Sequence, residues 1–221
     1  MEPQHGSVAL TKVGPRELAA RFAGYDRLSV RQRKKWIEIL LSFEMKNSYD
    51  VFDEHQQPVL RVREQGIGFV SLLKRLFLGP LRPFTANVDD IGTDVVEMQL
   101  DRPFRFFFHR LEVRASDGTL IGAIQRRWSW LRRIYEIEDA SARVIATLFG
   151  PILKPWTFEI QVGGQTLGAI RKRWSGLGKE MFTDADNFGV DLAGVTDPTL
   201  RVLAFAATVL IDVVHFERAK G

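Results

Sequence analysis

Near the end of the chain, residues 197–216 read DPTLRVLAFAATVLIDVVHF, a run that is apolar on almost every side of a helix. Asp197 is a typical N-cap and Pro198 suits the first helical turn, so one long helix is predicted over about 198–217. A helix this apolar has to be enclosed. Because only 202–211 is free of charge and a bilayer-spanning helix needs about 20 apolar residues, we expect enclosure by the protein. A C-terminal membrane anchor is the alternative.

Four polar side chains interrupt this helix along one stripe. At about 100° per residue they fall within about 60° of one another. Such a stripe either faces the opening of the enclosing sheet or finds partners on its wall. The four residues are Arg201, Thr208, Asp212 and His215.

The middle of the chain is built from short strands. Strand–turn–strand patterns with Gly or Asp at the turns occur at 49–63, 84–100, 111–126, 135–149 and 158–173. Strands recurring every 8–12 residues or so indicate an all-β sandwich or barrel. A closed sheet of about a dozen strands has the right size to enclose the terminal helix, so the expected fold is mainly β.

The N-terminal part has weaker signals. We expect a mobile tail over residues 1–28, with a short helix around 17–23, and one domain over 29–221. The run at 30–44 fits either a short helix or a buried strand.

Two of the strand pairs repeat one sequence. GTLIGAIQRRWS at 118–129 returns as QTLGAIRKRWS at 165–175, preceded by LEV at 111–113 and FEI at 158–160. The shared Gly-Ala-Ile and Arg-Trp-Ser predict a duplicated hairpin.

Composition excludes several classes of protein. The chain has 31 Lys+Arg against 27 Asp+Glu, a net charge of +4, and no cysteine. A disulfide scaffold, a thiolate zinc site, a Cys nucleophile and a thioester lipid anchor are therefore excluded. The first 30 residues lack an apolar signal segment, so we expect a cytoplasmic location.

Enzyme motifs are absent from the sequence. It contains no Gly-x-Ser-x-Gly elbow, no phosphate-binding Gly-x-x-x-x-Gly-Lys loop and no His pair at metal spacing. We therefore expect a binding or transport protein rather than an enzyme.

Six motifs, in order along most of the chain, resemble those of the phospholipid scramblase family. The resemblance implies a 12-stranded antiparallel barrel of the Tubby C-terminal type, wrapped round a hydrophobic C-terminal helix. It also implies calcium-dependent, bidirectional movement of phospholipids between leaflets. The motifs are FEMKNSY at 43–49, GPLRPFT at 79–85, DRPFR at 101–105, GAIRKRWSG at 168–176, FTDADNFG at 182–189 and LIDVVHFE at 210–217.

The sequence departs from that family in lacking its Cys-rich, acylated loops. Segments that pair aromatic residues with cations stand in their place, at 66–78, 104–109, 128–133 and 150–156. Our hypothesis is that they insert peripherally into an anionic phospholipid membrane. The alternative is that their apolar residues fill the core and their cations are solvated. The membrane-contact candidates are Phe69, Leu72, Leu73, Leu76, Phe77, Phe106, Phe107, Trp128 and Trp130.

The basic clusters are candidates for binding lipid headgroups. Their alternative role is as charged gatekeepers on outward strand positions. Nucleic acid is disfavoured as a partner, because the net charge is modest and no recognised motif is present. The clusters comprise Arg126, Arg127, Arg132, Arg133, Arg171, Lys172 and Arg173.

The calcium segment implied by the resemblance maps onto 184–195. Its candidate Ca2+ ligands are Asp184, Asp186 and Asn187. Because the fifth and twelfth positions of the loop are a Phe and a Val, calcium binding would be weak. The alternative is a turn leading into the last strand.

These observations predict a scramblase-like protein that binds anionic membranes and moves phospholipid. The alternative is a Tubby-like regulator that binds a lipid headgroup or a protein partner and transports nothing.

Overall fold

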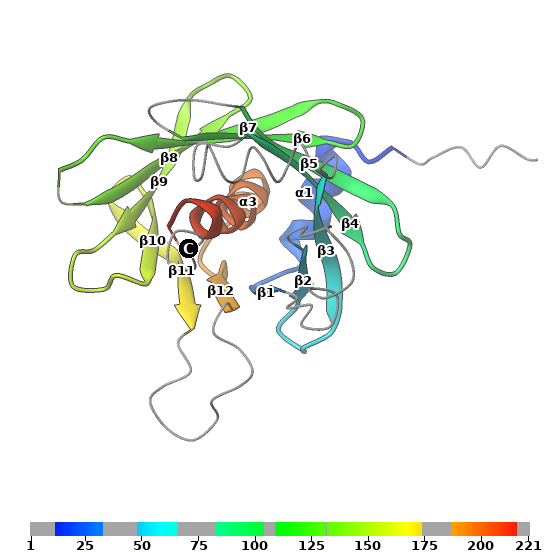
Figure 1. The fold of residues 1–221 in the computed structure, drawn as a ribbon, viewed down its shortest axis with the longest axis horizontal. Helices are drawn as coiled ribbons and strands as arrows, with labels where there is room; N and C mark the ends of the chain where they lie inside the picture. Colours follow the sequence, from blue (N-terminus) through cyan, green and yellow to red (C-terminus); the bar gives the residue numbers. More distant parts are fainter. Residues whose placement is uncertain are drawn as a thin grey trace, which may run out of the picture.

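The structure is a computed structural model, and it describes residues 12–32, 48–65, 83–103, 109–130, 132–173 and 187–215. In this part of the chain, twelve antiparallel strands form one closed barrel. Each strand pairs with its neighbours in the sequence, and β1 pairs with β12 to close the barrel (Figure 1). The predicted 12-stranded barrel is therefore confirmed. The strands are β1 (Arg27–Gln32), β2 (Ser48–Phe52), β3 (Pro58–Gln65), β4 (Phe84–Asp90), β5 (Val96–Arg102), β6 (Arg110–Ala115), β7 (Leu120–Arg127), β8 (Arg133–Asp139), β9 (Val144–Gly150), β10 (Thr157–Val162), β11 (Gln165–Arg173) and β12 (Asn187–Asp191).

The strands form where the sequence alternates apolar and polar residues between tight turns. In β2, Tyr49 and Val51 are buried while their neighbours are half-exposed, so one face of the strand lines the core. Gly163 and Gly164 form the turn between β10 and β11 with φ of 56° and 83°, a region that favours glycine. Inward side chains from all twelve strands contribute to one hydrophobic core.

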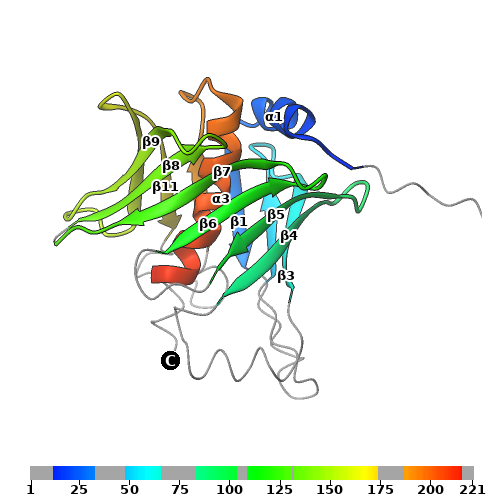
Figure 2. The same ribbon diagram turned by 90° about the horizontal axis from the view of Figure 1, so that it is seen from above.

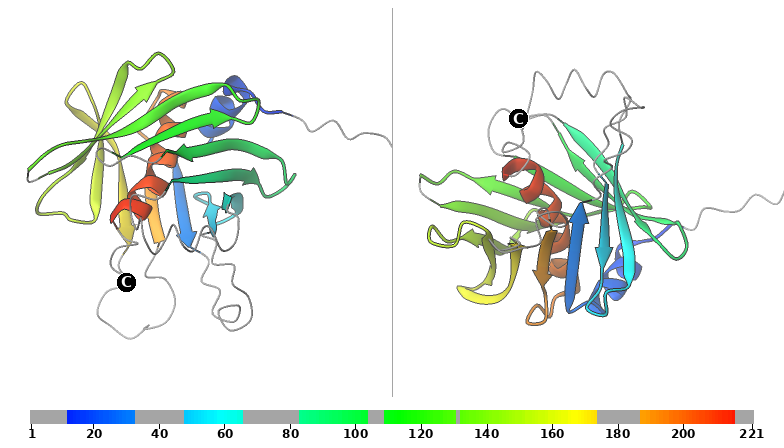
Figure 3. Two further views of the ribbon diagram at one scale, coloured as in Figure 1. Left: turned by 45° about the horizontal axis from the view of Figure 1, so that its top comes forward. Right: turned by 60° about the horizontal axis from the view of Figure 1, so that its bottom comes forward.

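The long C-terminal helix, α3 (Pro198–His215), runs through the barrel (Figure 3). Asp197 caps it as predicted, with its Oδ1 accepting from the backbone N–H of Thr199 at 2.8 Å and of Leu200 at 3.2 Å. Residues 200–212 are buried, so the predicted enclosure by the sheet is confirmed. No helix in the described ranges combines the length and apolar character needed to cross a membrane.

The N-terminal helix, α1 (Pro15–Ala23), differs from the expected tail. Figure 2 shows it beside the start of α3, and its Leu18 and Phe22 are fully buried in the core. The Phe22 ring lies 5.4 Å from that of Phe205 on α3. The helix expected around 17–23 is thus present, but it packs onto the barrel, and β1 already begins before residue 29.

The sequence repeat corresponds to two hairpins of identical register, β6–β7 and β10–β11. Val113 pairs with Gly122 and Ile160 with Gly168, and both hairpins shift register at the next residue. The two glycines are needed for the same reason. A Cβ on Gly122 would collide with a backbone carbonyl of β8, and one on Gly168 with a backbone carbonyl of β12.

Candidate functional site

The barrel has two different ends. The tight turns of the five hairpins from β2–β3 to β10–β11 lie at one end, here called the hairpin end. Because the strands are antiparallel, the other connections, such as β7 to β8 and β9 to β10, join strands at the opposite end, here called the loop end. The four aromatic and cationic segments predicted from the sequence all fall between strands that are joined at the loop end.

Large apolar side chains are exposed at the loop end. Trp128 is 70% exposed and Trp130 is 83% exposed, and their rings pack edge to face with centroids 6.2 Å apart. In the neighbouring connection Leu153 is 94% exposed, and Ile152 and Trp156 are also exposed. We call these five side chains the apolar rim. Trp128 and Trp130 are among the predicted membrane-contact residues, whereas the other three belong to the predicted segment 150–156 but not to that set.

Arg133 fixes one side of the apolar rim. Its guanidinium donates to the backbone carbonyls of Pro155 and, at 3.3 Å, Lys154. On the other side, the backbone N–H of Lys172 donates to the Trp156 carbonyl at 2.9 Å. The connections from β7 to β8 and from β9 to β10 are therefore held together, as expected from the pairing of Arg133 with Gly150.

The predicted basic clusters divide between two faces of the wall. On the outer face, Arg127 forms an ion pair of 2.5 Å with Glu136, which raises the pKa of Arg127, and Arg171 lies 3.9 Å from Asp191. Arg132 is exposed and lies 5.3 Å from the centroid of the Phe149 ring. The outer cations thus match the gatekeeper alternative more closely than a dedicated binding site.

Three other cations lie on the inner face, each next to a core aromatic residue. Arg126 pairs directly across the strands with the fully buried Tyr135, and directly opposed residues share a face. Arg133 lies over the Phe158 ring at 4.7 Å, and Lys172 lies 5.4 Å from the centroid of the Phe188 ring.

Arg102 on β5 belongs to the same inner layer and was missed by sequence reasoning. It is 2% exposed, lies 5.8 Å from the centroid of the Phe84 ring and donates to Nδ1 of His109 at 2.7 Å. The signal that could have found it is the alternation in β5, where the inward Met98 and Leu100 precede it. Burial raises the pKa of the nearby Tyr135 hydroxyl, despite three neighbouring guanidinium groups that lower it.

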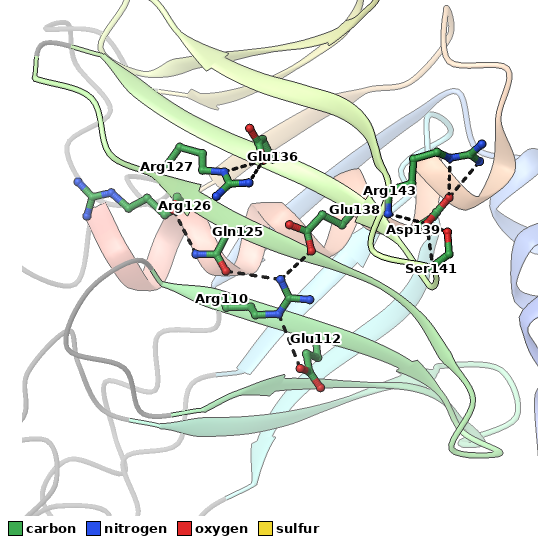
Figure 4. A network of polar contacts seen from close by, with 10 residues as sticks. All are labelled: Arg110, Glu112, Gln125, Arg126, Arg127, Glu136, Glu138, Asp139, Ser141 and Arg143. Carbon is green, nitrogen blue, oxygen red and sulfur yellow. Dashed lines mark hydrogen bonds and ion pairs between the residues drawn. The ribbon is translucent and has the colours of Figure 1, made fainter.

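The outer face of the same part of the barrel wall carries a network of polar side chains that contact one another. Arg110 contacts Glu138 at 2.7 Å and Glu112 at 3.7 Å, and it also reaches Gln125 (Figure 4). The same view shows the Arg126 side chain directed away from these residues. Every charge of this network is satisfied within the wall, so the network has a structural role.

The three described residues of the polar stripe of α3 have different partners, and only Asp212 bonds to a strand of the wall. Arg201 contacts the end of α1 near the hairpin end, and Thr208 donates to the Ala204 carbonyl of α3 itself at 3.3 Å. Asp212 accepts a hydrogen bond of 2.6 Å from the buried Tyr49 hydroxyl. The side chain of His215 lies outside the described part.

Most of the remaining candidates lie outside the described residues. The side chain of Arg173 and the calcium candidates Asp184 and Asp186 lie outside the described residues, whereas Asn187 is half-buried at the start of β12. Within the described ranges no three His, Asp or Glu residues gather as a metal site. The membrane-contact candidates that also lie outside are Phe69, Leu72, Leu73, Leu76, Phe77, Phe106 and Phe107.

Comparison with known proteins points to one family. A sequence model of the family described as Scramblase matches residues 7–218. The chain is 28% identical over 211 residues to phospholipid scramblase 2 of Bos taurus, covering 89% of this chain and 70% of that protein. It is 27% identical over 209 residues to phospholipid scramblase family member 5 of Homo sapiens, covering 88% and 75%. It is 29% identical over 211 residues to human phospholipid scramblase 4, covering 88% and 62%. With almost its whole length matched by the family, the chain belongs to the scramblase family.

Proposed function

We propose that the protein docks the loop end of its barrel onto an anionic phospholipid membrane and moves phospholipid between leaflets. The observation that carries the proposal is the apolar rim, where exposed tryptophan and aliphatic side chains lie beside arginine and lysine at one end of the barrel. The relatives named above are phospholipid scramblases, which supports phospholipid as the substrate class.

The physical chemistry of the rim suits a membrane surface. Tryptophan prefers the headgroup region, because its ring is apolar and its N–H is polar. The exposed Leu153 and Ile152 would leave water on docking. Their burial would stabilise the bound state by about 25 cal/mol per Å² of apolar area. Each nearby cation would add about 1 kcal/mol on an anionic leaflet.

The second part of the proposal is that calcium promotes lipid binding and transport. Asp184, Asp186 and Asn187 precede or begin β12, which starts at the loop end. A calcium ion held there would lie at the same end as the apolar rim, and its charge would attract anionic headgroups. Lipid binding and transport would then both rise with millimolar calcium.

Two assays on purified protein test the proposal. The first is co-sedimentation with phosphatidylcholine vesicles, with and without phosphatidylserine, in calcium or chelator. The second is transport of a fluorescent phospholipid in reconstituted vesicles. A Trp128→Ser/Trp130→Ser double variant should weaken vesicle binding about tenfold or more. The control is Val144→Ser, because Val144 is 46% exposed but lies at the hairpin end.

The outcomes separate the alternatives. Binding to anionic vesicles that the double variant loses and Val144→Ser retains, together with transport, supports the proposal. Binding without transport leaves a lipid-binding regulator as the function. Equal effects of the rim and control variants would remove the apolar rim as the docking surface.

A further inference from the structure

We propose that the inner face of the barrel at its loop end binds one phosphate group, through Arg126 and Arg133. The inference deepens the proposed function and rests on it, because it names the part of a phospholipid that the barrel would recognise. The shared chemistry is a phosphate mono- or diester, whether carried by a lipid or by a soluble molecule.

The position of Arg126 is set by its two cross-strand neighbours. It pairs with Tyr135 of β8 on one side. On the other side its backbone N–H donates to the His109 carbonyl at 2.8 Å, which extends the β6–β7 ladder by one residue. Tyr135 and His109 are both buried, and Arg126 is half-buried. The Arg126 side chain therefore belongs to the inner face of the barrel and lies at its loop end.

Among the residues that the structure describes, the charge balance of this inner layer is positive. The layer contains two acids, Glu64 of β3 and Asp212 of α3, and four cations, which are Arg102, Arg126, Arg133 and Lys172. Neither acid is ion-paired with Arg126 or Arg133, and no other carboxylate in the described ranges is. On the outer face, Arg127 of β7 and Arg110 of the neighbouring strand β6 both have carboxylate partners.

Arg133 is held in place without being neutralised. Its two contacts are to the uncharged backbone carbonyls of Lys154 and Pro155, and the ring of Phe158 lies beneath its guanidinium. A guanidinium has five N–H donors in a fixed fork, so donors remain for an anion. Gly150 makes room for this arrangement, since a Cβ there would lie 3.1 Å from both the Cβ and the carbonyl oxygen of Arg133.

The surroundings strengthen such a contact. The Phe158 ring lies under Arg133, and Tyr135 lies directly across the strands from Arg126. The two rings, with centroids 6.0 Å apart, form an apolar surface next to the arginines. An ion pair is stronger next to apolar groups than in bulk water, and guanidinium suits phosphate because it can bind two oxygens at once. Trp128 follows Arg126 by two residues, so a lipid could place its phosphate inside the rim and its chains beside Trp128.

The test uses the full chain and two probes. The soluble probe is glycerol 3-phosphate, titrated by calorimetry. The membrane probe is a phosphatidylcholine vesicle containing phosphatidylserine, tested by co-sedimentation. Arg126→Gln and Arg133→Gln should each weaken binding of both probes about tenfold, the effect of losing hydrogen bonds to a charged group. Arg126→Lys keeps the charge but not the fork and should fall between wild type and Arg126→Gln.

Two matched variants control for charge alone. Arg143→Gln removes a cation that pairs with Asp139 at the hairpin end and should leave both affinities unchanged. Arg127→Gln removes the outward neighbour of Arg126 and should leave binding of glycerol 3-phosphate unchanged. Thermal unfolding of each variant shows whether it is folded, and Arg126→Lys gives the comparison if Arg126→Gln is not.

The results separate this inference from the proposed function. Weaker binding of glycerol 3-phosphate in Arg126→Gln but not in Arg127→Gln supports the phosphate site, even if wild type binds no vesicles. If wild type binds vesicles but not glycerol 3-phosphate, or if Arg126→Gln and Arg127→Gln behave alike, the phosphate site is wrong while membrane docking stands.

Discussion

Arg201 on α3 donates a hydrogen bond of 2.9 Å to the backbone carbonyl of Tyr25, although the two residues are 176 positions apart. The same guanidinium reaches the carbonyls of Ala23 at 3.1 Å and of Val195 at 2.6 Å. The last carbonyls of a helix lack partners within the helix, and a cation at that end is favoured by the helix dipole. Arg201 therefore holds α1 onto the hairpin end of the barrel.

Replacing Arg201 tests this role. Arg201→Met keeps much of the apolar stem but leaves buried carbonyls without a donor, so it should lower the free energy of unfolding by about 3 kcal/mol. Urea denaturation measures the change. Arg27→Met, at an exposed position of β1, should change it by about 0.5 kcal/mol or less. Similar losses in the two variants would contradict the assigned role.

The second prediction concerns the stability of the barrel when the two equivalent glycines of the repeat, Gly122 and Gly168, are replaced. Gly122→Ala and Gly168→Ala should each destabilise the barrel by about 2 kcal/mol or more, because the added methyl group meets a backbone carbonyl that cannot move freely. Gly189 is the control, since a Cβ there lies 4.0 Å from its nearest neighbour, the Arg171 carbonyl oxygen. Thermal unfolding should rank both variants below Gly189→Ala. A tolerated Gly122→Ala would show that the two hairpins are not equivalent.

Acid stability should depend on Asp139, the last residue of β8, whose carboxylate accepts hydrogen bonds from the turn that follows. Hydrogen bonds from the Ser141 side chain and from Arg143 lower the pKa of Asp139 to about 2 from the usual 3.8. A carboxylate whose pKa is depressed in the folded state stabilises the fold above its unfolded pKa, and this contribution is lost as pH falls through the folded value. The contribution of Asp139 should therefore disappear between about pH 4 and about pH 2.

The matched variant is Asp139→Asn, which cannot titrate. Unfolding midpoints in urea, measured across this pH range, should fall more steeply for wild type than for Asp139→Asn. Parallel profiles would show that the turn contributes nothing to acid sensitivity.

Much of the fold was predictable because local and long-range signals agree. The apolar run after Asp197 predicts a helix that must be buried, and the regularly spaced turns predict enough strands to enclose it. The docking of α1 was not predictable, because it depends on Arg201 meeting carbonyls far away in the sequence. A short helix with only two buried apolar residues looks like part of a tail until that partner is known.

The basic clusters show a similar limit. Arg126 and Arg127 are adjacent in the sequence and look equivalent there. In a strand, however, successive side chains point to opposite faces, so one lies beside Tyr135 inside and the other pairs with Glu136 outside. Only the strand register decides which is which, and a shift of one residue would exchange the two.

The central claim, that the loop end faces the membrane, can be tested with a single environment-sensitive label. Because the chain has no cysteine, Leu153→Cys at the loop end and Ala140→Cys in the hairpin-end turn each give one labelling site. On vesicles containing phosphatidylserine, a fluorophore at position 153 should shift its emission to shorter wavelength, while one at position 140 should keep its aqueous spectrum. A shift at 140 that equals or exceeds the shift at 153 would contradict the claim.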